Sequence, residues 1–171
     1  MPGLRRQTTD ILALKALTIE MGEQAVAWGW AMVDAGRFSD GIWALTALTP
    51  PFHWSELSDL VGRIAREQGL QTPGSQDDAT LWLAHGHVED ILASGGEDFT
   101  SLKLVSRLWF DHETPDLVIF YQLKHAIREV EATGTQGHVE GLTKANWKTL
   151  LTDTCKAWLE THPRPDPFGE D

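Results

Sequence analysis

Residues 24–51 constrain the fold most strongly, because they predict two helices folded back on each other. Apolar residues recur at alternating steps of three and four along residues 11–33, which is typical of a helix buried over much of its circumference. Gly36 then supplies the left-handed position that ends such a helix. Polar residues at 39–40 offer the N-cap of a short second helix, and the proline pair at 50–51 ends it.

The first helix of this pair has two readings at its N-terminal side. Thr8, Thr9 or Asp10 offers an N-cap, so the apolar pattern allows one helix from Asp10 to Ala35. It equally allows two shorter helices separated at Gly22, because glycine weakens a helix interior. In either case the rest of the chain is expected to pack against this hairpin.

Four residues of the hairpin resemble a known helix pair. Gly29, Met32, Gly36 and Phe38 fall at the small, aromatic, glycine and aromatic positions of a tetratricopeptide-type unit. Gly41 stands where that family has alanine, and no second copy recurs at a fixed period. The resemblance therefore covers about one unit. It implies a helical hairpin and identifies no ligand-binding residue.

The remaining chain predicts further helices. Residues 117–121 are rich in β-branched and aromatic side chains, as a buried strand would be, but helical spacing continues for two more turns and favours a helix. No run of alternating strands is evident. The predicted fold class is all-α, a compact bundle or an irregular helical-hairpin array of six to eight helices. After the hairpin, these helices are expected to begin near Trp54, Asp77, Asp98, Thr114 and Thr143. The predicted N-caps of the last three are Asp98 or Thr100, then Thr114, then Thr143.

A chain of 171 residues suits one domain. We expect a flexible N-terminus over residues 1–8, a single all-α domain over 9–162 and a Pro-rich acidic tail over 163–171. The single cysteine excludes an internal disulfide and fits a reducing compartment. The sequence has neither the apolar run of a signal peptide nor that of a membrane span, so a cytoplasmic location is expected.

The net charge of −11 is concentrated in the middle of the chain. Residues 77–116 contain nine acidic residues and only two basic ones, Lys103 and Arg107. Such a segment repels phosphate backbones and attracts a basic protein partner, so we expect protein rather than nucleic-acid binding. The residues predicted to contact the partner are Trp82, as an apolar anchor, and the carboxylates of Asp77, Asp78, Glu89, Asp90, Glu97, Asp98, Asp111 and Glu113.

Metal and nucleophile chemistry find little support. The HGHVED segment at 85–90 resembles the start of the H-x-H-x-D-H motif of the metallo-β-lactamase superfamily, but Glu89 and Asp90 replace its aspartate and final histidine. Side chains two residues apart on a helix diverge by about 200° and cannot share an ion.

Cys155 lies on an apolar stripe, where cysteine usually acts as a small hydrophobe. No metal or cofactor is predicted.

The eight tryptophans divide by context. Those on or beside apolar stripes are expected in the core, namely Trp28, Trp30, Trp43, Trp147 and Trp158. Those that flank breaks or the acidic segment are the better candidates for an interface, namely Trp54, Trp82 and Trp109.

The leading functional hypothesis is a small acidic cytoplasmic binding or inhibitor protein, of which a bacterial toxin-immunity protein is one concrete form. It rests on the localised carboxylates and on the absence of any recognisable catalytic motif. The second hypothesis is a helical enzyme with a dispersed site near His85, His87 and His112. The third is a DNA mimic, whose carboxylates imitate a phosphate array.

Overall fold

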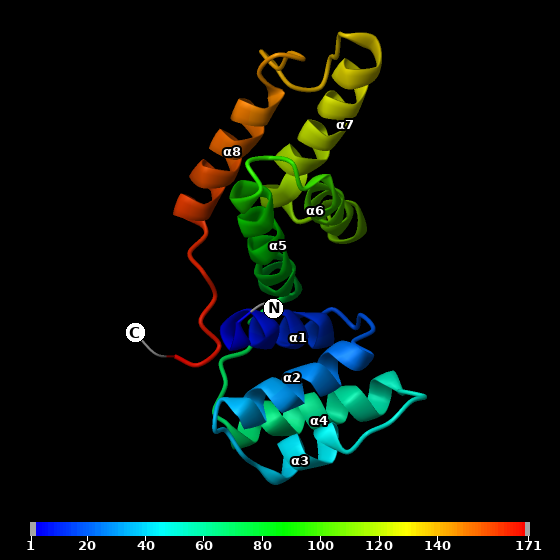
Figure 1. Cartoon of the computed structure of the whole chain (residues 1–171), viewed down its shortest axis with the longest axis vertical. Helices are drawn as coiled ribbons and strands as arrows, with labels where there is room; N and C mark the ends of the chain where they lie inside the picture. The colour runs from blue at the N-terminus through cyan, green and yellow to red at the C-terminus, as the bar shows by residue number, and fades with distance from the viewer. Residues whose placement is uncertain (1–2, 170–171) are drawn as a thin grey trace. The chain divides into compact units, whose positions relative to one another are not determined.

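The computed structural model describes residues 3–169, and within that range the chain forms eight α-helices and one short 3₁₀ helix, with no strand (Figure 1). The all-α prediction is confirmed. The chain divides into two compact units. The first unit holds the described residues up to Leu83 together with those from Pro165, and the second spans Ala84–Arg164. Sequence reasoning had expected a single domain over 9–162.

The first unit is built from four helices and the start of a fifth. These are α1 (Leu4–Ala16), α2 (Glu23–Asp34), α3 (Asp40–Thr46), α4 (Trp54–Glu67) and the first turns of α5 (Gln76–Ala93). The second unit holds the rest of α5, α6 (Phe99–His112), the 3₁₀ helix η1 (Pro115–Leu117), α7 (Val118–Thr133) and α8 (Trp147–Thr161). None of the helices within residues 3–169 is long and apolar enough to cross a bilayer.

The apolar run at 11–33 forms two helices, which confirms the second of the two readings. The break lies at Thr18, whose φ of +58° closes α1 in the position that glycine usually takes. The amide of Ile19 donates to the Leu14 carbonyl at 2.9 Å, which completes the cap. Gly22, with φ of +49°, then leads into α2.

The predicted hairpin of α2 and α3 is confirmed (Figure 1). Gly36 has φ of +74°, and the next amide, that of Arg37, donates to the Met32 carbonyl at 2.9 Å. The hydroxyl oxygen of Ser39 accepts from the Ile42 amide and caps α3. A Cβ atom on Gly29 would lie 3.0 Å from the Thr46 methyl, so glycine permits the close approach of the two helices.

Trp28 is fully buried at the centre of the first unit's core. Thr8 and Thr9 lie inside α1 rather than capping it, because the helix begins at Leu4, within the stretch expected to be flexible. Their hydroxyls donate to the carbonyls one turn earlier, at 2.8 and 2.9 Å. Other fully buried side chains of this core are Met32, Ile42, Leu45, Leu57, Val61 and Ile64.

In the second unit, Asp98 is the one of the two candidate caps that caps α6, since its carboxylate accepts from the Ser101 amide at 2.9 Å. Residues 117–121 lie in η1 and α7 and are helical, which confirms the choice over a strand. The prediction that Thr143 caps the last helix was wrong. That helix begins at Trp147, and the Thr143 amide donates to the Asn146 side chain at 2.7 Å in the preceding turn.

The segment from Pro165 to Gly169, expected to be part of a tail, contacts the first unit. The Gln71 amide donates to the Pro167 carbonyl at 2.8 Å. The Arg37 guanidinium lies 4.2 Å from the centre of the Phe168 ring, which packs against the core.

Candidate binding sites

The predicted partner-binding residues fall in both units. Asp77, Asp78 and Trp82 belong to the first unit, and the remaining six belong to the second. Asp77 and Asp78 are exposed in the first turn of α5, where carboxylates suit the positive end of the helix dipole. Trp82 is half-buried and packs against the core of the first unit.

Several of these carboxylates already have hydrogen-bond or ion-pair partners within the chain. Asp98 serves as a helix cap, and its pKa is lowered chiefly by the hydrogen bond from the Ser101 hydroxyl. Three others form ion pairs with distances of 2.8–3.0 Å, namely Glu89 with Arg164, Glu97 with Lys148 and Asp111 with Arg107. These exposed pairs neutralise part of the charge expected to face a partner. Asp90 and Glu113 are exposed.

The histidines weighed for catalysis occupy α5 and α6 of the second unit. His85 is buried, with its Nδ1 3.7 Å from the Glu89 carboxylate and its ring 6.2 Å from that of Trp158. His87 and His112 are half-buried. Within residues 3–169, no three histidine, cysteine or carboxylate side chains gather closely enough to hold a metal ion.

Cys155 is buried in the second unit's core. Burial raises the pKa of its thiol to about 12, because the apolar surroundings disfavour the thiolate. Since the thiolate is the reactive form, a thiol of this kind is a poor nucleophile at neutral pH.

Two tryptophans that were expected in the core are exposed in the structure. Trp30 and Trp43, expected in the core, have 49% and 48% of their surface exposed. Trp30 projects from α2 on the side away from its buried residues, and Trp43 stacks on Phe38, itself 56% exposed, at 5.9 Å between ring centres. We call Trp30, Phe38 and Trp43 the hairpin aromatic surface.

The tryptophans expected at an interface are engaged inside the chain. The indole nitrogen of Trp54 donates to the Ile19 carbonyl at 3.2 Å, and Trp109 lies 4.3 Å from Tyr121 between ring centres. Both side chains are half-buried, so their role at an interface stays a prediction. Of the other expected core residues, Trp28 and Trp158 are buried and Trp147 is half-buried.

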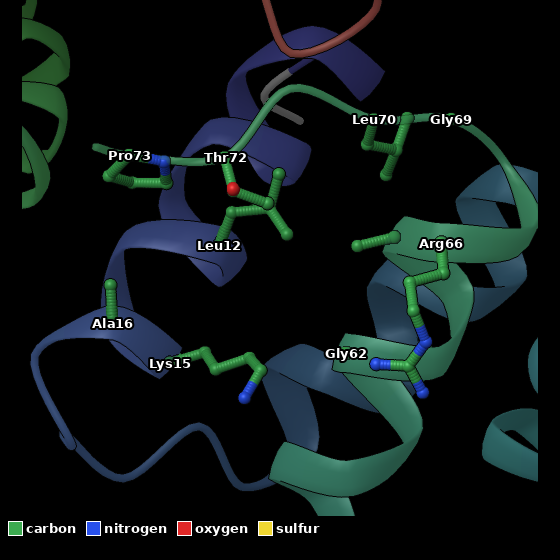
Figure 2. A pocket seen from close by; sticks show the side chains of 10 residues that line it. Leu12, Lys15, Ala16, Gly62, Arg66, Gly69, Leu70, Thr72 and Pro73 are labelled. Carbon is green, nitrogen blue, oxygen red and sulfur yellow. The ribbon is translucent and has the colours of Figure 1, made fainter.

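A cavity of about 560 Å³ lies in the first unit, between α1, α4 and the segment that follows α4 (Figure 2). Leu12, Leu70 and Pro73 contribute apolar surface to its wall. The side chains of Lys15 and Arg66 reach into it from opposite helices (Figure 2). We call it the α1–α4 cavity. Sequence reasoning missed it, because the residues that form it are far apart along the chain.

A second hollow, about 530 Å³ in volume, lies along α6 and α7 in the second unit. Desolvation lowers the pKa of Lys124, and the charges of Arg128 and Lys103 lower it further. Two pairs with helical i, i+4 spacing form this basic surface, Lys103 with Arg107 and Lys124 with Arg128. The i, i+4 spacing of these four bases is visible in the sequence and could have predicted a basic surface. The strongly negative net charge of the chain drew attention to the acidic residues instead.

Comparison of the chain with protein-family models, with curated proteins and with solved structures gave no match. The functional reading therefore rests on the residues and geometry of this chain.

Proposed function

We propose that this chain is a non-catalytic binding protein of the cytoplasm that docks a basic protein partner on the hairpin aromatic surface. One observation carries the proposal. Trp30, Phe38 and Trp43 leave about half of their surfaces in solvent, although each belongs to a well-packed hairpin. Exposed tryptophans supply large apolar contact area and are the residue type most enriched among the energetically dominant residues of protein interfaces.

Charge around these rings favours a basic partner. Residues 20–50 contain a single base, Arg37, which is engaged over the Phe168 ring. The acidic residues of the same stretch are Glu20, Glu23, Asp34 and Asp40. Exposed aromatic side chains in a stretch with four acids and one base complement a partner whose exposed apolar residues are accompanied by lysine or arginine.

The acidic segment 77–116 takes a supporting role in this proposal. Its carboxylates attract a basic partner at long range, while the aromatic rings hold the partner after contact. Inhibition of a basic toxin by an immunity protein is one biological setting that fits such a division. The single cysteine is consistent with the cytoplasmic location, because one cysteine cannot form an internal disulfide and such disulfides are typical of oxidising compartments.

The test immobilises the wild-type chain and a Trp30→Ser, Trp43→Ser double variant, and compares the proteins that each retains from a cell extract. Each retained protein is then measured by surface plasmon resonance at two salt concentrations. We expect a basic partner whose affinity falls at least tenfold in the double variant, mainly through faster dissociation. Phe110→Ser is the matched control, because Phe110 is 61% exposed but lies in the other unit.

Equal binding by the double variant and the wild type contradicts the proposal. A partner that is displaced by duplex DNA favours the DNA-mimic hypothesis instead. Asp77→Asn with Asp78→Asn should slow association more than it speeds dissociation, and the effect should shrink at high salt.

A further inference from the structure

We propose that the α1–α4 cavity binds a small amphipathic carboxylate, a molecule with one carboxylate group and an apolar chain or ring. In this assignment Lys15 and Arg66 hold the carboxylate, and the apolar wall of the cavity holds the rest. The inference goes beyond protein docking, since it uses different residues and a different class of ligand.

The two cations converge on one place. A Cβ atom built on Gly62 would lie 3.6 Å from the Lys15 amine and 3.7 Å from Nη1 of Arg66, so these nitrogens are at most about 7.3 Å apart. This separation lets one carboxylate contact both. Within residues 3–169 neither side chain has a carboxylate at ion-pair distance, and the Lys15 amine donates to the Ser58 hydroxyl at 3.0 Å. Two like charges therefore face one opening without a compensating anion.

Gly62 creates the room for this arrangement. It lies in the middle of α4, where glycine is unfavourable for the helix itself. A Cβ atom at this position would come within 3.1 Å of Cε of Lys15. Because a larger residue would push the lysine away, glycine lets the Lys15 side chain extend from α1 up to α4 on the side of Gly62, as Figure 2 shows.

The wall opposite the cations is apolar and fixed in place. Gly69, with φ of +63°, ends α4, and the Leu70 amide donates to the Ala65 carbonyl at 2.8 Å. This cap turns the chain so that Leu70 and Pro73 lie over the cavity with Leu12 of α1 (Figure 2). A volume of about 560 Å³ is within the usual range for small-molecule sites.

The two halves of the site select the ligand class together. The paired cations favour an anion, whereas the apolar wall disfavours a fully hydrated one such as inorganic phosphate. The first unit has 11 acidic and 6 basic residues among those described, so its overall field opposes a dianion more than a monoanion. A monocarboxylate with an apolar body satisfies each of these conditions.

The experiment is isothermal titration calorimetry of the full chain with three probes. Octanoate carries both features of the ligand, 1-octanol carries only the apolar chain, and acetate carries only the charge. We expect saturable one-to-one binding of octanoate at least tenfold tighter than that of either other probe. Octanoate that binds no tighter than 1-octanol, or no saturable binding of octanoate, overturns the proposal.

Variants then assign the binding to this cavity. Lys15→Gln with Arg66→Gln should weaken octanoate binding at least tenfold and leave 1-octanol binding unchanged. Arg63→Gln is the matched control on the same helix, because Arg63 pairs with Glu67 at 2.6 Å and does not line the cavity. Circular dichroism checks that each variant is folded. If the double variant and the control bind octanoate equally, the assignment to this cavity is wrong. The Trp30→Ser, Trp43→Ser variant should bind octanoate as tightly as the wild type, whether or not it still binds the protein partner.

Discussion

The indole nitrogen of Trp28 donates a 2.9 Å hydrogen bond to the hydroxyl oxygen of Thr8, and both side chains are fully buried. The same hydroxyl donates to the Leu4 carbonyl, so one oxygen connects the core tryptophan of α2 to the backbone of α1. The Thr8→Val variant keeps the shape and removes the acceptor. We expect it to lower the free energy of unfolding by about 1–3 kcal/mol, because it leaves a buried donor unpaired.

Trp28→Ala should lower the free energy of unfolding by more, about 3–5 kcal/mol, because it removes a fully buried aromatic side chain as well as the hydrogen bond. Urea unfolding followed by circular dichroism measures both changes. A Thr8→Val variant as stable as the wild type would show that the indole finds another partner.

Thr18 offers a stabilising substitution. Its positive φ of +58° is costly for a β-branched residue, and the side chain is exposed. Thr18→Gly should therefore raise the free energy of unfolding by roughly 0.5–1 kcal/mol, after the greater freedom of glycine in the unfolded chain is subtracted. Thermal unfolding tests this expectation, and a lower melting temperature would mean that the Thr18 side chain stabilises the turn.

Two helical glycines of the first unit should respond to alanine in opposite directions. Gly62→Ala should stabilise the chain by about 0.5–1 kcal/mol, because the new methyl group meets only the far ends of the Lys15 and Arg66 side chains. Gly41→Ala should destabilise it by about 1–3 kcal/mol, because its Cβ would lie 2.7 Å from a Glu67 oxygen that accepts from the Gly41 amide. Urea midpoints compare the two, and the same sign for both would contradict this reading of their surroundings.

The raised pKa of Cys155 predicts both its reactivity and a pH dependence. The native thiol should react with Ellman's reagent far more slowly at pH 8 than the thiol of the chain unfolded in urea. Its pKa rises from an ordinary value near 9 to about 12 on folding, so the unfolded chain loses this proton first. Stability from this group is thus complete below about pH 9 and is lost as the pH rises towards 12.

The Cys155→Ala variant supplies the control for that titration. Its stability should fall less steeply than that of the wild type over the same pH range, even though its baseline stability is lower. Parallel pH profiles for the two chains would show that the thiol is not protected by burial.

The fold class could be predicted from the sequence because helical spacing and caps are local. Gly36, Ser39 and Asp98 carry caps that a sequence pattern identifies directly. The break at Thr18 was harder to place, because threonine in a left-handed conformation has no sequence signature. Trp30 and Trp43 were misplaced for a related reason. Spacing defines the stripes on a helix but does not say how many of them a neighbouring helix covers.

The candidate sites were less predictable, because they depend on contacts between distant residues. Lys15 of α1 and Arg66 of α4 are separated by two helices in sequence, yet they face the same cavity. The acidic segment was visible from composition alone, but composition could not show that Lys148 and Arg164 would pair with Glu97 and Glu89.

The return of Pro165–Gly169 to the first unit makes the second unit an insertion in the chain of the first. During synthesis the first unit therefore cannot complete its structure until the entire second unit has been made, because Pro167 and Phe168 follow that unit in the sequence. The second unit, whose residues are contiguous, is free to fold first even though the ribosome makes it later than most of its neighbour. The last contacts of the first unit therefore form only after the second unit has been synthesised, although most of the first unit is synthesised before it.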